Sequence, residues 1–129
     1  MSFLSNIFGS SDAEKQSDSK VNWIPLTNLT QLADIESNSS VKPIVIFKHS
    51  TRCSISRMAL KQFEREYDLN EVVDAYFLDL ISYRDVSNEI ANRFGVQHQS
   101  PQLILIKNKK ATYNASHSDI NAETLKSKI

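Results

Sequence analysis

The sequence is short of cysteine, of net charge and of long apolar runs, and each shortage excludes something. Among its 129 residues there is one cysteine, Cys53, so no disulfide can form within the chain. A fold without disulfides fits a reducing compartment best, and we predict a cytoplasmic location. Lys and Arg number 15, as do Asp and Glu. This balance argues against nucleic acid as the main partner, because phosphate binding needs a concentrated positive face.

The remaining composition is that of an ordinary globular chain, with 40% hydrophobic and 23% charged residues and no apolar run long enough to span a bilayer. Residues 1–8 are apolar but lack the basic residues that begin a secretory signal, and residues 9–20 are polar like a linker. We predict a flexible N-terminal tail over residues 1–20, without membrane contact, and one domain over residues 21–129. A weak surface anchor in the tail stays open as an alternative.

Apolar periodicity predicts alternating strands and helices through the domain. In chain order we expect an edge strand at 23–26, a helix capped at Thr27 or Asn28 and ended at 38–40, a strand at 41–48, a helix at 53–67, a strand at 72–80, a helix at 83–94 closed by Gly95, a strand at 102–106, a hairpin partner at 111–115, and a helix capped at Ser118 or Asn121 and ended at 129. This order predicts an α/β fold with a central mixed β-sheet flanked by helices.

The position of Cys53 suggests chemistry. It follows an apolar, β-branched run at residues 44–47 and opens the predicted helix at 53–67. The unpaired N–H groups and positive dipole end of a helix favour thiolate over thiol, and the thiolate is the reactive species in disulfide exchange. A buried structural cysteine is the alternative, but the residues at 49–52 are polar, as expected around a partly exposed reactive cysteine.

The pair Ser100 and Pro101 opens the predicted strand at 102–106. A proline is tolerated there because its missing N–H falls at the end of the hydrogen-bond ladder. Only about 5–6% of X–Pro bonds in folded proteins are cis, so the residues alone favour a trans bond.

The strand that runs into a helix beginning at Cys53, with a later hairpin strand opened by Pro101, resembles the thioredoxin fold. The resemblance implies that Pro101 is a cis residue beside Cys53 and that Ser100 and Pro101 offer backbone groups to a bound thiol. In the usual Cys-x-x-Cys motif the second cysteine resolves the adduct, and here Ser56 stands in its place. Serine cannot complete a disulfide, which leaves a cycle with a single thiol.

Residues 47–56 read FKHSTRCSIS, and with Ser100-Pro101-Gln102 they resemble the monothiol bacilliredoxin family. That family is linked to the low-molecular-weight thiol bacillithiol and is often labelled as general stress proteins. The resemblance spans residues 21–129. Many members carry proline directly after the cysteine, where this chain has Ser54. Because such a proline mainly preorganises the helix, we expect its loss to alter thiol reactivity without abolishing it.

The resemblance implies that the chain is a bacterial thiol–disulfide oxidoreductase. Its catalytic Cys53 would remove bacillithiol, or a similar small thiol, from protein mixed disulfides. The small thiol acts as a co-substrate, no cofactor or metal is bound, and the partners are S-thiolated client proteins and a reductase. The expected substrate-binding residues are Thr51, Arg52, Ser54, Ile55, Ser56, Ser100 and Pro101.

Roles within this set have alternatives. Arg52 either adds positive charge beside the thiol and holds a carboxylate of the small thiol, or is an ordinary solvated side chain. Thr51, Ser54 and Ser56 either donate hydrogen bonds to the thiolate or cap the helix. For His49, at the end of the strand, we favour packing or solvent contact over proton transfer.

Two other function classes stay open. A non-catalytic interaction module of a stress response is favoured if Cys53 is inaccessible and unreactive. An arsenate-reductase-like enzyme would need more arginines near the cysteine than Arg52 and Arg57. His98 and His117 have no partners at zinc-ligand spacing. The residues Ser54 and Ile55 do not match the iron–sulfur site of monothiol glutaredoxins, which has glycine after the cysteine.

Overall fold

Strands and helices alternate along residues 19–129, the part of the chain that this computed structural model describes. The predicted tail at residues 1–20 therefore falls almost wholly outside the described residues. The elements in chain order are β1 (Trp23–Pro25), α3 (Thr30–Asn38), β2 (Ile44–His49), α4 (Ser54–Glu66), β3 (Asp74–Asp79), α5 (Arg84–Phe94), β4 (Gln102–Lys107), β5 (Lys110–Ser116), the 3₁₀ helix η1 (His117–Asp119) and α6 (Ala122–Lys128). The predicted order of strands and α-helices is confirmed.

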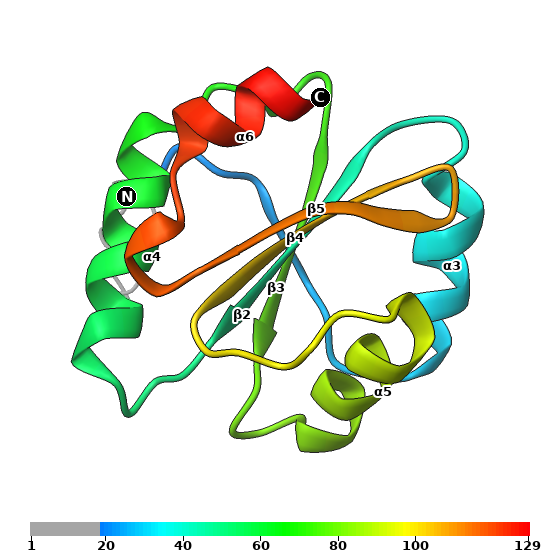
Figure 1. Cartoon of the computed structure of the whole chain (residues 1–129), viewed down its shortest axis with the longest axis horizontal. Coiled ribbons are helices and arrows are strands. Elements are labelled where there is room, and N and C mark those ends of the chain that lie inside the picture. The colour runs from blue at the N-terminus through cyan, green and yellow to red at the C-terminus, as the bar shows by residue number, and fades with distance from the viewer. Residues whose placement is uncertain (1–18) are drawn as a thin grey trace, which may run out of the picture.

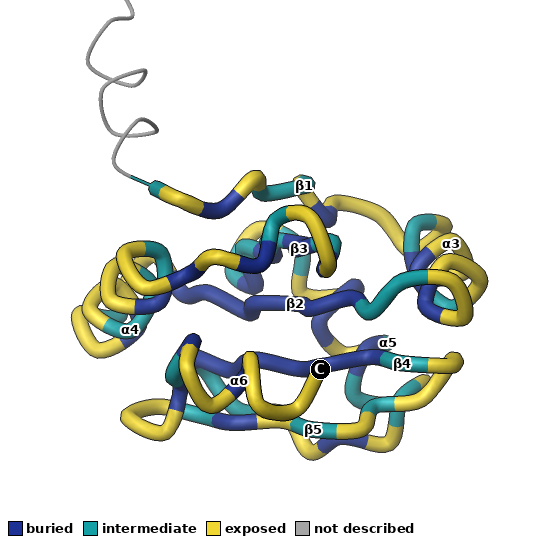
Figure 2. The backbone as a smooth tube through the Cα atoms, turned by 90° about the horizontal axis from the view of Figure 1, so that it is seen from above, coloured by how far each residue is buried: buried dark blue, intermediate teal, exposed yellow. Residues whose placement is uncertain are grey.

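The five strands form one mixed sheet in the order β1-β3-β2-β4-β5. β1 and β2 lie parallel to β3, whereas β4 lies antiparallel to both β2 and β5. Figure 2 shows the strands stacked in this order, with helices at either side. The predicted α/β class with a mixed sheet is therefore confirmed. Among residues 19–129 there is no helix with the length and apolar character to cross a membrane.

Each face of the sheet has its own core. α4 and α6 lie on one side of the sheet, and α3 and α5 lie on the other (Figure 1). We call the two buried clusters the α4-side core and the α5-side core. The α4-side core contains Val45, Phe47, Phe63, Tyr67, Leu103, Leu105 and Leu125, among others. The α5-side core contains Leu32, Ile35, Ile44, Ile46, Val86, Ile90, Ile104 and Ile106, among others.

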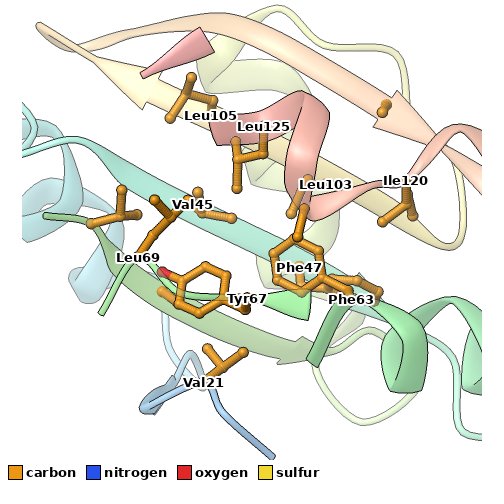
Figure 3. Packing of buried hydrophobic residues seen from close by; sticks show 14 residues of the cluster. Val21, Val45, Phe47, Phe63, Tyr67, Leu69, Leu103, Leu105, Ile120 and Leu125 are labelled. Carbon is orange, nitrogen blue, oxygen red and sulfur yellow. The ribbon is translucent and has the colours of Figure 1, made fainter. Parts of the chain in front are cut away.

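Strand β2 supplies both cores because successive side chains of a strand point to opposite faces. All six of its residues are buried. Phe47 points into the α4-side core, where its ring lies 5.6 Å from that of Phe63 (Figure 3). Ile46 points into the α5-side core. Fully burying one such side chain stabilises the fold by about 1.5–3 kcal/mol, so a strand buried on both faces needs a continuous apolar run.

Two strands begin later than their apolar runs predict. Val41 and Val72 were expected in strands, yet their exposed fractions are 90% and 49%. The N–H of Val41 donates to the carbonyl of Asn38 and that of Val72 to the carbonyl of Leu69, each at 3.0 Å. Turn hydrogen bonds therefore occupy these backbone groups, and each strand starts only after its turn.

Helix ends follow the predicted residues closely. Gly95 closes α5 with φ of 64°, a left-handed conformation that glycine adopts without strain. Asn121 caps α6 by accepting a hydrogen bond from the Thr124 N–H at 2.9 Å. The alternative cap, Ser118, lies instead in η1. At α3 the side chain of Asn28 accepts from the N–H of Gln31 at 3.2 Å, one residue before the formal N-cap.

Candidate active site

Cys53 is the N-cap residue of α4. Its backbone is extended, with φ of −112° and ψ of 122°, and its carbonyl accepts the first hydrogen bond of the helix from the Arg57 N–H at 3.1 Å. Its own N–H donates to the Ser50 carbonyl at 3.2 Å, which closes a turn between β2 and α4. The thiol is partly exposed. It therefore lies at the positive end of a helix of 13 residues, in a position that solvent can reach.

The first turn of α4 has backbone N–H groups that are unpaired within residues 19–129. Those of Ser54, Ile55 and Ser56 make no hydrogen bond to any other residue in the described part of the chain. No side chain caps the helix there. Such groups are suited to a negative charge, whether a thiolate at Cys53 or an anionic group of a ligand.

Ser56 points inward. Its side chain is fully buried, and its hydroxyl oxygen accepts a hydrogen bond from the Ser50 N–H at 3.1 Å. The same oxygen lies 2.8 Å from Nδ1 of His49, and the direction of this hydrogen bond is set by the tautomer of the ring. Ser56 thus ties the end of β2 to the first turn of α4 and fixes the loop that carries Cys53.

His49 packs against Phe77 and does not face solvent, which is one of the two placements expected from its position at the strand end. Only 5% of it is exposed, and its ring lies 5.5 Å from that of Phe77. Burial lowers the pKa of His49, although the nearby carboxylates of Asp79 and Glu64 act in the opposite direction. A lowered pKa favours the neutral form of the ring that bonds to Ser56.

The two arginines near the cysteine are placed differently. Arg52 is exposed and forms no ion pair with another described residue. Arg57 is also exposed, and its Nη1 donates to the carbonyl of Thr51 at 3.2 Å. Arg57 therefore helps to hold the loop, which sequence reasoning missed because it treated this residue only as a second positive charge. Thr51 and Ser54 are exposed beside Cys53.

Strand register brings Ser100 and Pro101 to the same end of the sheet as Cys53. Lys48 of β2 pairs with Gln102 of β4, so the loop that leaves β2 and the loop that enters β4 lie at one sheet end. The Ser100–Pro101 bond is cis. The trans bond that the residues alone favour is therefore wrong, and the cis bond that the resemblance implies is confirmed.

The backbone of Pro101 is hydrogen-bonded within the described part of the fold, whereas that of Ser100 is not. The carbonyl of Pro101 accepts a hydrogen bond from the His117 N–H at 3.1 Å. The N–H and carbonyl of Ser100 make no hydrogen bond to other residues of the described segment. Ser100 is half-buried, so its peptide groups are the ones that a bound extended segment or small thiol can pair with.

The family model of the monothiol bacilliredoxin BrxC matches residues 24–125 of this chain. The chain belongs to the monothiol bacilliredoxin family. A solved structure described as a candidate oxidoreductase with a thioredoxin fold is 36% identical, with a TM-score of 0.70, over 81% of this chain and 91% of that one. The thioredoxin of Malassezia sympodialis is 16% identical, with a TM-score of 0.64, over 85% and 88% of the two chains. For a thioredoxin of Nicotiana alata the values are 22%, 0.62, 84% and 90%.

This bacilliredoxin has an apolar groove beside the cysteine helix. The exposed residues Ile55 and Met58 contribute to it, with exposed fractions of 56% and 71%. Helical spacing predicts both on the same apolar face of α4 as Phe63, but they are exposed and line the groove instead of entering the core. The groove is lined by Ile55, Met58, Ala59, Gln62, His117, Ser118 and Ile120.

Sequence reasoning missed two buried polar residues at the same end of the sheet. Lys48 and Gln102 are 0% and 1% exposed. Burial lowers the pKa of Lys48 to about 8. The only signal available was their position, since a lysine and a glutamine flank apolar runs that are otherwise uninterrupted. Within residues 19–129 no three His, Cys, Asp or Glu side chains are grouped so as to hold a metal ion.

Proposed function

We propose that this bacilliredoxin removes bacillithiol, or a closely similar small thiol, from mixed disulfides with protein cysteines. The observation that carries the proposal is the pairing of one thiol with one inward-pointing serine. Cys53 is partly exposed at the N-terminus of α4, while Ser56, at the position of a resolving cysteine, is buried and bonded to His49. A site with this arrangement can form an adduct with a small thiol but has no second sulfur to displace it.

The proposed reaction is two successive thiol–disulfide exchanges. In the first, the Cys53 thiolate attacks the bacillithiol sulfur of the mixed disulfide. The old S–S bond breaks as the new one forms, and the client leaves as a thiolate that takes a proton from water. In the second, a free bacillithiol thiolate attacks the adduct, regenerating the Cys53 thiolate and leaving bacillithiol disulfide. A partner reductase then reduces that disulfide.

Three groups of residues support the two steps in this proposal. The free N–H groups at the start of α4 stabilise the Cys53 thiolate as attacking and leaving group. Arg52 binds a carboxylate of the small thiol, since its guanidinium is exposed and unpaired by the described carboxylates. The backbone of Ser100 pairs with the bound substrate, and Pro101 packs beside it. Thr51, Ser54 and Ile55 complete the rim.

Clients are S-thiolated proteins, and the co-substrate is the small thiol itself. The cycle needs no bound cofactor or metal. A chain with one thiol and no stabilising disulfide fits a reducing compartment, so we propose that it acts in the cytoplasm of a bacterium that makes bacillithiol.

The test is release of a client thiol from a protein that carries bacillithiol on one cysteine. A matched client carrying glutathione is run beside it. We expect release from the bacillithiol client to be at least about tenfold faster, because the rim of Thr51, Ser54 and Ile55 would contact the part in which the two small thiols differ, whereas both carry a carboxylate for Arg52. The Cys53→Ser variant should show no release above background while keeping its circular dichroism spectrum. Ser40→Ala, a change in an exposed hydroxyl outside the site, should stay active.

The outcome also separates the alternatives. No release from either client, with Cys53 still open to alkylation, would move the conclusion to a non-catalytic interaction module. Arsenate-dependent oxidation of the small thiol, without client release, would favour the arsenate-reductase-like reading. Equal rates with both clients would retain the oxidoreductase and reject bacillithiol as its particular thiol.

A further inference from the structure

We infer that Lys48 and Gln102 are positioning residues that hold the loop before Pro101 in place for exchange at Cys53. The loop in question comprises residues 97–100, between the buried Val96 and the cis proline. The inference rests on the proposed function for its catalytic consequence, whereas the holding of the loop is a property of the fold.

Lys48 and Gln102 form one cross-strand pair. They are register partners in β2 and β4, so their side chains lie on the same face of the sheet. That face is the α5 side, since Ile46 and Ile104, two residues away on each strand, belong to the α5-side core. Two adjacent polar side chains thus occupy the end of an aliphatic core, at the end of the sheet where Cys53 and Pro101 lie.

Gln102 binds the loop through both ends of its amide. Nε2 donates to the carbonyl of Gln97 at 2.9 Å, and Oε1 accepts from the N–H of Gln99 at 3.3 Å. The amide therefore supplies hydrogen bonds to two backbone groups of the loop that have no partner in a neighbouring strand of the described chain. Because Gln102 is 1% exposed, water cannot substitute readily for these bonds.

Lys48 binds the middle of the same loop. Its Nζ donates to the carbonyl of Ser87 in α5 at 3.2 Å and lies 3.3 Å from Nδ1 of His98. Ser87 Oγ is also 3.4 Å from that nitrogen. Burial, together with the positive charges of Lys48 and Arg84, lowers the pKa of His98, which favours the neutral ring that can accept from an ammonium.

These contacts account for all the hydrogen bonds that tie residues 97–100 to the remainder of the described chain, since each of them involves Lys48, Ser87 or Gln102. An apolar pair would fill the core equally well without binding the loop. A fully buried lysine without a carboxylate partner is unfavourable, and it is expected only where its bonds serve a purpose. The purpose that the contacts indicate is to present Ser100 and Pro101 in one fixed conformation.

The experiment compares Lys48→Met with Lys107→Met, a change of the same type at the opposite end of β4. Two rates are measured on each: alkylation of Cys53 by iodoacetamide, which needs only the thiolate, and bacillithiol removal from a client. Since small displacements of positioning groups carry large kinetic penalties, we expect removal to slow about tenfold in Lys48→Met, with alkylation within about twofold. Lys107→Met should change neither rate. Amide hydrogen exchange at residues 97–100 should accelerate in Lys48→Met alone.

His98 offers a milder pair of variants if Lys48→Met fails to fold. His98→Leu removes the acceptor, whereas His98→Asn supplies an amide oxygen near the place of Nδ1, and only the former should slow bacillithiol removal. A folded variant in which removal and alkylation keep their wild-type ratio would overturn the inference. If the wild type itself removes no bacillithiol, the proposed function fails, and unchanged amide exchange at residues 97–100 would then overturn the holding role separately.

Discussion

The two faces of the sheet are built from different side chains, yet both end in polar groups at the same place. The α4-side core is rich in aromatic rings: Trp23, Phe47 and Phe63 pack on one another, and Phe63 also packs on Tyr67. The α5-side core is mostly aliphatic. The last two residues of β2, Lys48 and His49, point to opposite faces of the sheet. The first belongs to the α5 side and the second to the α4 side.

The end of β2 organises a site made of two loops. His49 bonds Ser56, which fixes the loop that carries Cys53. Lys48 bonds His98, in the loop that leads to Pro101. Consecutive residues of a single strand therefore brace the nucleophile on one face and the proline loop on the other. The apolar run before them supplies the rigidity that makes such bracing effective.

Removing an aromatic ring from the α4-side core should destabilise the fold more than any of the other changes proposed below. Phe63 is 1% exposed and contacts the rings of Trp23, Phe47 and Tyr67. We expect Phe63→Ala to lower the free energy of unfolding by about 3–5 kcal/mol, because a large cavity would remain under α4. Urea denaturation followed by circular dichroism measures this. Met58→Ala on the exposed side of the same helix should change it by less than about 0.5 kcal/mol, and equal losses would refute the assignment of faces.

Ser56→Ala tests the brace on the α4 side alone. It leaves the Ser50 N–H and Nδ1 of His49 buried without their partner, which costs about 1–3 kcal/mol of unfolding free energy. Ser54→Ala, two residues earlier and exposed, is the matched control and should be nearly neutral. A Ser56→Ala protein as stable as the wild type would show that the hydroxyl does not hold the loop.

Raising the pH tests the brace on the α5 side. Burial lowers the pKa of Lys48 from 10.5 to about 8, so between these values the unfolded chain binds more protons than the folded one. The sign is therefore a gain of stability as the pH rises, by about 1–2 kcal/mol between pH 8 and 10. The unfolding free energy of the wild type and of Lys48→Met is measured across that range, so that the tyrosines, which begin to ionise near pH 10 in both proteins, cancel in the comparison. Lys48→Met should lose this rise, and a rise of the same size in the variant would assign it to other groups.

The smallest effect we predict concerns the helix that covers the α4-side core at the C-terminal end. Asn121→Ala removes the hydrogen bond from the Thr124 N–H and should lower the free energy of unfolding by about 1 kcal/mol. Thermal denaturation resolves a change of that size. Ser118→Ala, at the other residue that the sequence allows as a cap, is the comparison. A larger loss of unfolding free energy in Ser118→Ala than in Asn121→Ala would contradict the assignment of Asn121 as the cap.

The order of the elements was predictable from sequence because it depends on the spacing of apolar residues, which is visible within each short segment of the chain. The runs of β2 and β4, the amphipathic α4 and the terminator Gly95 all carry strong local signals. The strand starts at Val41 and Val72 were not predictable, since turn hydrogen bonds of the backbone displaced apolar residues that favour strands.

Within the site, sequence placed Cys53 at the helix start, but pairings between distant residues escaped it. That Ser56 points inward follows from His49 and the Ser50 N–H, both visible only once β2 and α4 pack together. Lys48 is the last residue of the predicted strand at 41–48, and the partners of its ammonium group, in α5 and at His98, are 39 and 50 residues away. The cis bond at Pro101 was implied by resemblance and opposed by the general rarity of such bonds.

One mass measurement decides whether this bacilliredoxin works with a single thiol. The wild type and Cys53→Ser are each mixed with a bacillithiol-carrying client in the absence of free thiol, and intact masses are recorded. We expect the wild type to gain the mass of one bacillithiol as the client loses it. The adduct should persist until free bacillithiol is added, because Ser56 cannot resolve it. An unmodified wild type beside an unchanged client would contradict thiol exchange at Cys53. An equal gain of mass on the Cys53→Ser variant would contradict it too.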